Sequence, residues 1–126
     1  MSIRSLVSMS VAAVFALAGC GGGSSSSDDT VPANADLVVT AIDGLAWAES
    51  NYTATAGAVV VAATNESSQP HNLHFVDSTG TQLPKGLDTP GRGDIAVDTI
   101  TLDPGTYTLI CTIAGHDNMR ATLTVD

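Results

Sequence analysis

The chain has 126 residues and a formal net charge of −9, with 44% hydrophobic and 4% aromatic residues. This length is typical of one domain, and a charge of this sign disfavours binding to nucleic acid or to anionic lipid head groups. We therefore expect one domain with no nucleic-acid partner. Its acidic surface either provides solubility or steers a basic protein partner.

Residues 1–19 have the layout of an export signal, with a positive charge at Arg4 and an apolar run over residues 6–17 that is too short to span a membrane. The sequence Leu-Ala-Gly-Cys follows at residues 17–20. It resembles the lipobox of bacterial lipoproteins. The resemblance implies that residues 1–19 are a signal peptide and that Cys20 carries a lipid, so that the exported protein is anchored to the membrane on the periplasmic or another extracytoplasmic face. An ordinary secretory signal with a chance cysteine is the alternative.

Residues 20–35 form the next segment, which after Cys20 consists mainly of Gly, Ser and Asp. Such a composition cannot bury a core and predicts a flexible linker with an end-to-end distance of about 20 Å. The folded domain is then expected over residues 36–126. Cleavage before Cys20 would leave three basic residues against 13 acidic ones, which is a net charge of −10.

The pattern from residue 36 onward is typical of β-strands, because short apolar or alternating runs are separated by turn residues. About seven strands are predicted, at residues 37–42, 47–54, 59–64, 71–77, 95–102, 106–111 and 120–125. Residues 81–93 contain two Pro and three Gly and predict an irregular connection. No segment has a helical period, so we expect an all-β fold, an antiparallel Greek-key β-sandwich. Trp47 is expected to pack in the core near a sheet edge, and Tyr107 to anchor the sandwich.

The cysteines need an explanation of their own, since the chain has only Cys20 and Cys111. With Cys20 assigned to the lipid, Cys111 would be an unpaired thiol in a compartment where thiols are normally oxidised. A disulfide between the two is the alternative, but it conflicts with cleavage and lipidation at Cys20. Metal ligation is therefore the preferred role for Cys111.

Every His, Cys and Met beyond Cys20 lies in one of two short windows, residues 70–74 and 111–119. The residues in these windows are His71, His74, Cys111, His116 and Met119. Two imidazoles, a thiolate and a weak axial thioether are the ligand set of copper electron-transfer sites. Thiolate suits Cu(I) and imidazole suits both oxidation states, so such a site needs little rearrangement when an electron is transferred.

Residues 36–126 resemble the cupredoxins, the blue copper proteins typified by azurin and plastocyanin. The resemblance rests on three stretches: residues 52–73, which end in Pro-His-Asn-Leu; residues 102–111, which lead to the cysteine; and residues 111–125, which form an azurin-type ending. It implies a cupredoxin-like β-sandwich that binds one copper ion cycling between Cu(I) and Cu(II).

Position by position, the resemblance implies four metal ligands. They are the imidazoles of His71 and His116, the thiolate of Cys111 and the axial thioether of Met119. It also implies that Asn72 and Thr112 link the two ligand segments and orient the ligands.

Two features depart from the family pattern. Ala114 stands where the ligand loop usually has a proline, which predicts a more flexible loop. Two residues separate His116 from Met119, fewer than in azurin or plastocyanin, so either the loop closes more tightly or Met119 lies off the copper axis. Strand alternation places His74 on the face opposite His71. We therefore expect His74 to be a surface or partly buried histidine, with an accessory ligand as the alternative.

The function predicted from these features is that of an exported, membrane-anchored blue copper protein that carries single electrons. The resemblance places the docking patch for redox protein partners near His116. A copper storage or delivery module and a metal-free structural β-sandwich are the alternatives. A Cys–His nucleophile pair or a zinc enzyme is a further class, but we expect no enzyme activity because a ligated thiolate leaves no obvious general base. We expect a monomer.

Overall fold

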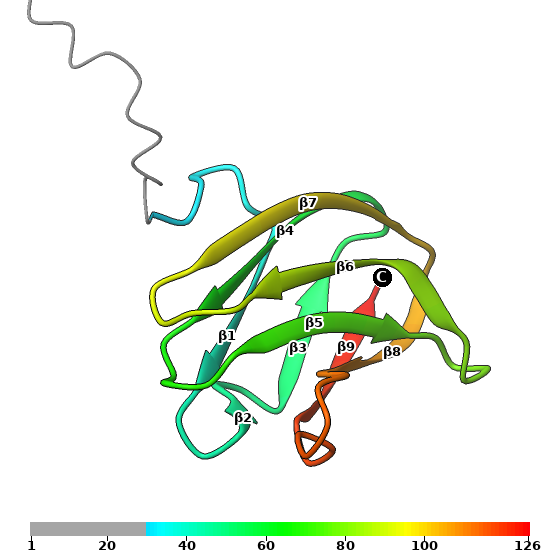
Figure 1. Cartoon of the computed structure of the whole chain (residues 1–126). Helices are drawn as coiled ribbons and strands as arrows, with labels where there is room; N and C mark the ends of the chain where they lie inside the picture. The colour runs from blue at the N-terminus through cyan, green and yellow to red at the C-terminus, as the bar shows by residue number, and fades with distance from the viewer. Residues whose placement is uncertain (1–29) are drawn as a thin grey trace, which may run out of the picture.

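The computed structural model describes residues 30–126, where nine strands form two sheets that pack face to face (Figure 1). The predicted signal peptide, the lipid on Cys20 and most of the predicted linker lie outside the described residues. No helix capable of crossing a membrane occurs in the described part of the chain. The strands are β1 (Leu37–Ile42), β2 (Ala46–Trp47), β3 (Asn51–Ala54), β4 (Gly57–Asn65), β5 (His71–Val76), β6 (Gln82–Thr89), β7 (Ile95–Leu102), β8 (Gly105–Ile110) and β9 (Arg120–Val125).

The first sheet has the strand order β2-β1-β4-β7 and the second has the order β3-β9-β8-β5-β6. The β-sandwich is as predicted, but its sheets are mixed, because β1 pairs with β4 and β3 pairs with β9 in parallel. A parallel pair needs a crossover connection. Residues 43–56 provide one by carrying the chain into the second sheet and back, so the prediction of purely antiparallel sheets was wrong on this point.

Two of the predicted elements also differ from the structure. The single strand predicted over residues 47–54 is divided into β2 and β3, since the chain changes sheets between them. The prediction of an irregular connection over residues 81–93 is wrong for residues 82–89, which form β6. This strand lies at the edge of its sheet, where Pro84 is tolerated because an edge strand leaves some backbone N–H groups unpaired.

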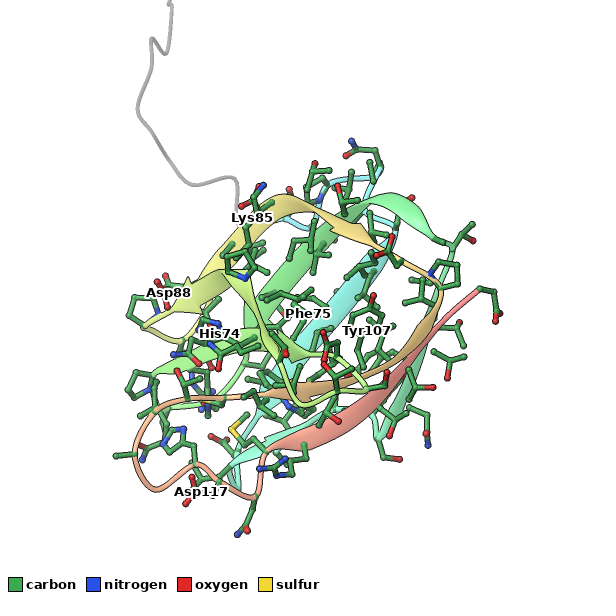
Figure 2. All side chains as sticks on the ribbon, turned by 90° about the vertical axis from the view of Figure 1, so that its right-hand side faces the viewer. His74, Phe75, Lys85, Asp88, Tyr107 and Asp117 are labelled. Atoms are coloured by element: carbon green, nitrogen blue, oxygen red, sulfur yellow. The ribbon has the colours of Figure 1, made fainter. Side chains whose placement is uncertain are left out.

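Alternating residues of both sheets fill the space between them. Phe75 and Leu73 of β5, with Leu109 of β8 and Leu123 of β9, have no exposed surface. Figure 2 shows Phe75 between the two sheets. Burying one such side chain contributes about 1.5–3 kcal/mol to folding, so this core holds the strands, and whatever their ends carry, in fixed positions.

The pairing of β5 with β8 brings the two predicted ligand windows together. The strands are antiparallel, with His74 opposite Ile110, so the beginning of β5 lies beside the end of β8. At the opposite end of β8, the Tyr107 hydroxyl donates a 2.9 Å hydrogen bond to the carbonyl of Asp103. Tyr107 thereby anchors the turn that leads into β8, in agreement with the role predicted for it. Trp47 is buried on the edge strand β2, also as predicted.

Candidate metal centre

Three of the predicted ligands, His71, Cys111 and His116, meet at one end of the sandwich. His71 begins β5, Cys111 directly follows β8, and His116 lies in the loop between β8 and β9. They are 2%, 5% and 6% exposed. Within residues 30–126 they form the only group of His, Cys, Asp and Glu residues that is compact enough to hold a metal ion.

The separations within this group are short. One potential ligand atom from each of the three residues lies within 4.8 Å of the other two. The thiol Sγ of Cys111 is 3.5 Å from Nδ1 of His116, and the two imidazole rings are 5.0 Å apart between centroids, inclined at 51°. Since metal–nitrogen and metal–sulfur bonds are about 2.0–2.3 Å long, this spacing is close to what one ion can bridge.

The imidazole of His71 has one partnered and one unpartnered nitrogen. Its Nε2 lies 2.6 Å from the hydroxyl oxygen of Ser67. Its Nδ1 is one of two buried side-chain nitrogen or oxygen atoms in the described structure that lack a hydrogen-bond partner. Burial, and to a smaller extent the neighbouring His116, lower the pKa of His71. A neutral imidazole with a free buried nitrogen is what a metal ligand requires, so the site fits a metal ion.

Two successive turns shape the β8–β9 loop. The backbone N–H of His116 donates to the carbonyl of Ile113, and the N–H of Met119 donates to the carbonyl of His116, both at 3.0 Å. Gly115 between them has φ of +87°, a conformation that favours glycine. Figure 2 shows Asp117 at the tip of this loop. These turns position His116 in a loop that has Ala114 where the family pattern has a proline.

Met119 occupies the end of the second turn and is 1% exposed. It belongs to the hydrophobic core. The short spacing from His116 corresponds to a hydrogen-bonded turn between the two residues. Its burial at this end of the core is compatible with the predicted axial role.

Asn72 and Thr112, the residues next to His71 and Cys111, bond to each other. The Asn72 amide donates to the Thr112 hydroxyl, and its carbonyl oxygen accepts from the Thr112 backbone N–H, both at 2.8 Å. The pair therefore links the beginning of β5 directly to the ligand loop, which is the contact predicted from the sequence.

His74 lies apart from the metal-binding group. It is half-buried and stands opposite Gly86 of β6, where its ring occupies the space that a side chain on Gly86 would fill. Its Nδ1 is 3.2 Å from the amide nitrogen of Gln82. Since His74 is absent from the group of potential ligands, the structure gives no support to an accessory role at this centre.

Sequence reasoning missed Ser67 and Asn65, which are 1% and 0% exposed beside His71. They lie between the strands predicted at residues 59–64 and 71–77, in a polar stretch where only their burial distinguishes them. A shallow hollow beside His116 was missed as well. It is lined mainly by residues 43–45, 68–69 and 114–116.

No protein-family model and no curated protein matches the chain, whereas several solved structures do. Reduced auracyanin from the photosynthetic bacterium Roseiflexus castenholzii matches with a TM-score of 0.63 and 23% identity over 71% of this chain and 95% of its own. A reduced tryptophan-to-tyrosine mutant of amicyanin matches with a TM-score of 0.58 and 26% identity over 76% and 86%. A purple cupredoxin from Nitrosopumilus maritimus matches with a TM-score of 0.56 and 22% identity over 72% and 100%.

The described domain therefore has the cupredoxin fold, and the resemblance predicted from the sequence is confirmed. At one end of this fold, the imidazoles of His71 and His116 and the thiol of Cys111 come together. The buried thioether of Met119 belongs to the same loop as His116. This combination of soft and borderline donors fits a single copper ion.

Proposed function

We propose that this protein is an exported, membrane-anchored blue copper protein that carries one electron at a time between redox partners. The observation that carries the proposal is the buried group His71, Cys111 and His116, in which the Nδ1 atom of His71 has no partner among the described residues. Amicyanin, to which the chain is similar, is described in a reduced form, which is consistent with a redox role.

The bound copper would supply the redox chemistry, gaining one electron from a reduced donor and losing it to an oxidised acceptor. The protein residues hold the ligands in place. His71 and Cys111 adjoin paired strands, and the Asn72–Thr112 hydrogen bonds join their segments. A preformed site of this kind limits rearrangement between the two oxidation states, which favours electron transfer over ligand exchange.

The partner surface is proposed to lie at the hollow beside His116, because this ligand comes closest to solvent there. The chain has 13 acidic and four basic residues, so a donor or acceptor with a basic docking surface would be attracted. Lipid attached to Cys20 would hold the domain near the membrane through the linker of residues 20–35. No catalytic step is part of the proposal.

The two alternatives fit the site less well. Proteins that deliver copper need ligands that are accessible for exchange, whereas these three residues are at most 6% exposed. A structural β-sandwich without metal would bury the unpartnered Nδ1 of His71 at a cost of about 1–3 kcal/mol with no compensation.

The proposal is tested by the visible absorption spectrum of residues 21–126 with one equivalent of Cu(II). This version keeps all described strands and omits Cys20, whose thiol would compete for the metal. We expect an intense blue band that ascorbate bleaches and that the Cys111→Ser variant lacks. A colourless protein, or one that prefers zinc, would refute the electron-carrier function. If the blue band is present, slow copper release and reversible voltammetry would distinguish an electron carrier from a copper-delivery module.

A further inference from the structure

A buried polar cluster adjoins His71, whose Nε2 atom contacts Ser67. Asn65 at the end of β4, Ser67 in the following loop and Thr89 at the end of β6 are 0%, 1% and 2% exposed. Buried polar groups are stabilising only when all their hydrogen bonds are made. The pattern of these bonds therefore shows which atom is the donor in each contact.

The orientation of the Asn65 amide follows from two carbonyl neighbours. Its Nδ2 donates to the carbonyl of Gln69 at 2.7 Å and to that of Thr89 at 2.8 Å. Its Oδ1 is consequently turned towards Ser67, where it accepts from the Ser67 backbone N–H at 2.8 Å. An amide oxygen cannot donate, so any further bond to it requires a donor on the other side.

The Ser67 hydroxyl provides that donor. Its oxygen lies 2.9 Å from Oδ1 of Asn65 and 3.1 Å from the carbonyl of Gln69. Both atoms are acceptors, so the single hydroxyl hydrogen is used on this side. The oxygen then accepts from the Gln69 backbone N–H at 3.1 Å. One acceptor position of the hydroxyl remains.

That remaining position faces His71. Since the Ser67 hydroxyl hydrogen is already used, the 2.6 Å contact with Nε2 of His71 requires the imidazole to donate. A neutral imidazole carries one hydrogen, so a hydrogen on Nε2 leaves Nδ1 with a free lone pair. Nδ1 is the atom without a partner in the described structure.

We propose that Ser67, oriented by Asn65, is a positioning residue that holds His71 in the tautomer with hydrogen on Nε2 and so presents Nδ1 to the metal. The inference rests on the proposed copper-binding function for its purpose, but the tautomer itself is a property of the metal-free protein. Bonds to the far nitrogen of a metal-binding histidine commonly fix its tautomer and ring orientation, and their loss lowers metal affinity by about 10–100-fold.

The first experiment is long-range proton–nitrogen NMR of the ¹⁵N-labelled, metal-free protein of residues 21–126, at a pH where His71 is neutral. We expect His71 in the Nε2–H form alone. A predominant Nδ1–H form, or a mixture of the two, would overturn the proposal without any variant being made. Because no metal is present, this result does not depend on whether the blue copper spectrum is obtained.

The second experiment compares Ser67→Ala with Ser78→Ala, a control at an exposed serine in the β5–β6 turn, away from the metal centre. The Cu(I) affinity is measured by competition with a chromophoric chelator. We expect Ser67→Ala to populate both tautomers and to bind Cu(I) about 10–100-fold more weakly, whereas Ser78→Ala behaves as the unsubstituted protein. Ser67→Thr, which keeps a hydroxyl, should restore the single tautomer.

A purely structural role for Ser67 makes a different prediction. Ser67→Ala would then melt at a lower temperature but keep the Nε2–H tautomer and the Cu(I) affinity, and this outcome would overturn the proposal. If Ser67→Ala does not fold, the tautomer of the unsubstituted protein decides. A protein that shows the expected tautomer but no blue band would refute the proposed function, while the assignment of Ser67 as the residue that sets the tautomer of His71 would stand.

Discussion

Asn72 and Thr112 exchange two hydrogen bonds of 2.8 Å across a sequence separation of 40 residues. Each of them directly follows a ligand at the end of a strand, since His71 begins β5 and Cys111 directly follows β8. The distance between those ligands is therefore set by a contact between their neighbours as well as by the pairing of β5 with β8. The contact therefore helps to hold the two ligand segments together.

We expect Asn72→Ala to weaken both the fold and the metal site. Two partly exposed hydrogen bonds are lost, so the free energy of unfolding should fall by about 1 kcal/mol, and the Cu(I) affinity should fall as the ligand loop gains freedom. Urea unfolding and chelator competition measure the two effects. Asn51→Ala is the control, since among the described residues the exposed side chain of Asn51 bonds only to the side chain of Ser50. Equal copper affinities in the two variants would contradict the orienting role.

The fold could be predicted from the sequence where the signal is local. The runs at residues 37–42, 95–102 and 120–125 match β1, β7 and β9 because alternation and β-branched residues are enough to indicate a strand. The parallel pairing of β1 with β4 could not be predicted in this way, since it depends on where the chain changes sheets. Strand β6 could not be predicted because Pro84 and the nearby glycines are typical of irregular segments. They are tolerated here because β6 lies at the edge of its sheet, which the sequence alone does not show.

The candidate metal centre likewise contains residues that the sequence indicates and residues that it does not. His71, Cys111 and His116 could be selected because such residues are rare in this chain and cluster in two windows. Ser67 could not, since serine is common in loops. Its contact with His71 depends on the burial and the amide orientation of Asn65, which no sequence pattern indicates.

The packing of His74 on Gly86 predicts a coupling between the two residues. Gly86→Ala would place a methyl group where the His74 ring lies, so the ring must turn outwards. We expect a loss of about 1–2 kcal/mol in unfolding free energy, most of which disappears when His74→Ala is present as well. A double-mutant cycle measures this coupling. Additive effects in the cycle would show that the ring does not cover Gly86.

The same variant tests the role of His74 at the metal. His74→Ala should leave the copper absorption unchanged, because His74 lies outside the ligand group, whereas His71→Ala should abolish it. Loss of the blue band in both variants would make His74 a ligand after all.

Asp77 predicts a pH dependence of stability. Hydrogen bonds from the Thr79 hydroxyl and from the backbone N–H groups of Thr81 and Thr79 lower the pKa of this carboxyl below its ordinary value of 3.8. The unfolded chain therefore takes up the proton first as the pH falls. The stabilisation by Asp77 is complete above pH about 4–5 and is lost as the pH falls through the folded-state pKa.

Asp77→Asn should therefore be less stable than the unsubstituted protein at neutral pH, and the difference should shrink at acidic pH. Thermal unfolding of both proteins across this range measures it. Asp88→Asn is the control, because Asp88 is an exposed acid with no side-chain hydrogen bond in the described structure. A difference that is constant with pH would place the effect of Asp77 in packing rather than in its charge.

We expect a substitution of Met119 to change the reduction potential while leaving the free energy of unfolding nearly unchanged. Met119→Leu preserves volume in the core, so the unfolding free energy should change by less than about 1.5 kcal/mol. An axial thioether tunes the potential of blue copper sites. If Met119 is that ligand, removing its sulfur donor destabilises Cu(II) relative to Cu(I), and the reduction potential rises by tens of millivolts. Protein-film voltammetry measures this shift, with Leu123→Met as the control for repacking elsewhere in the core. An unchanged potential in Met119→Leu would assign Met119 to the core alone.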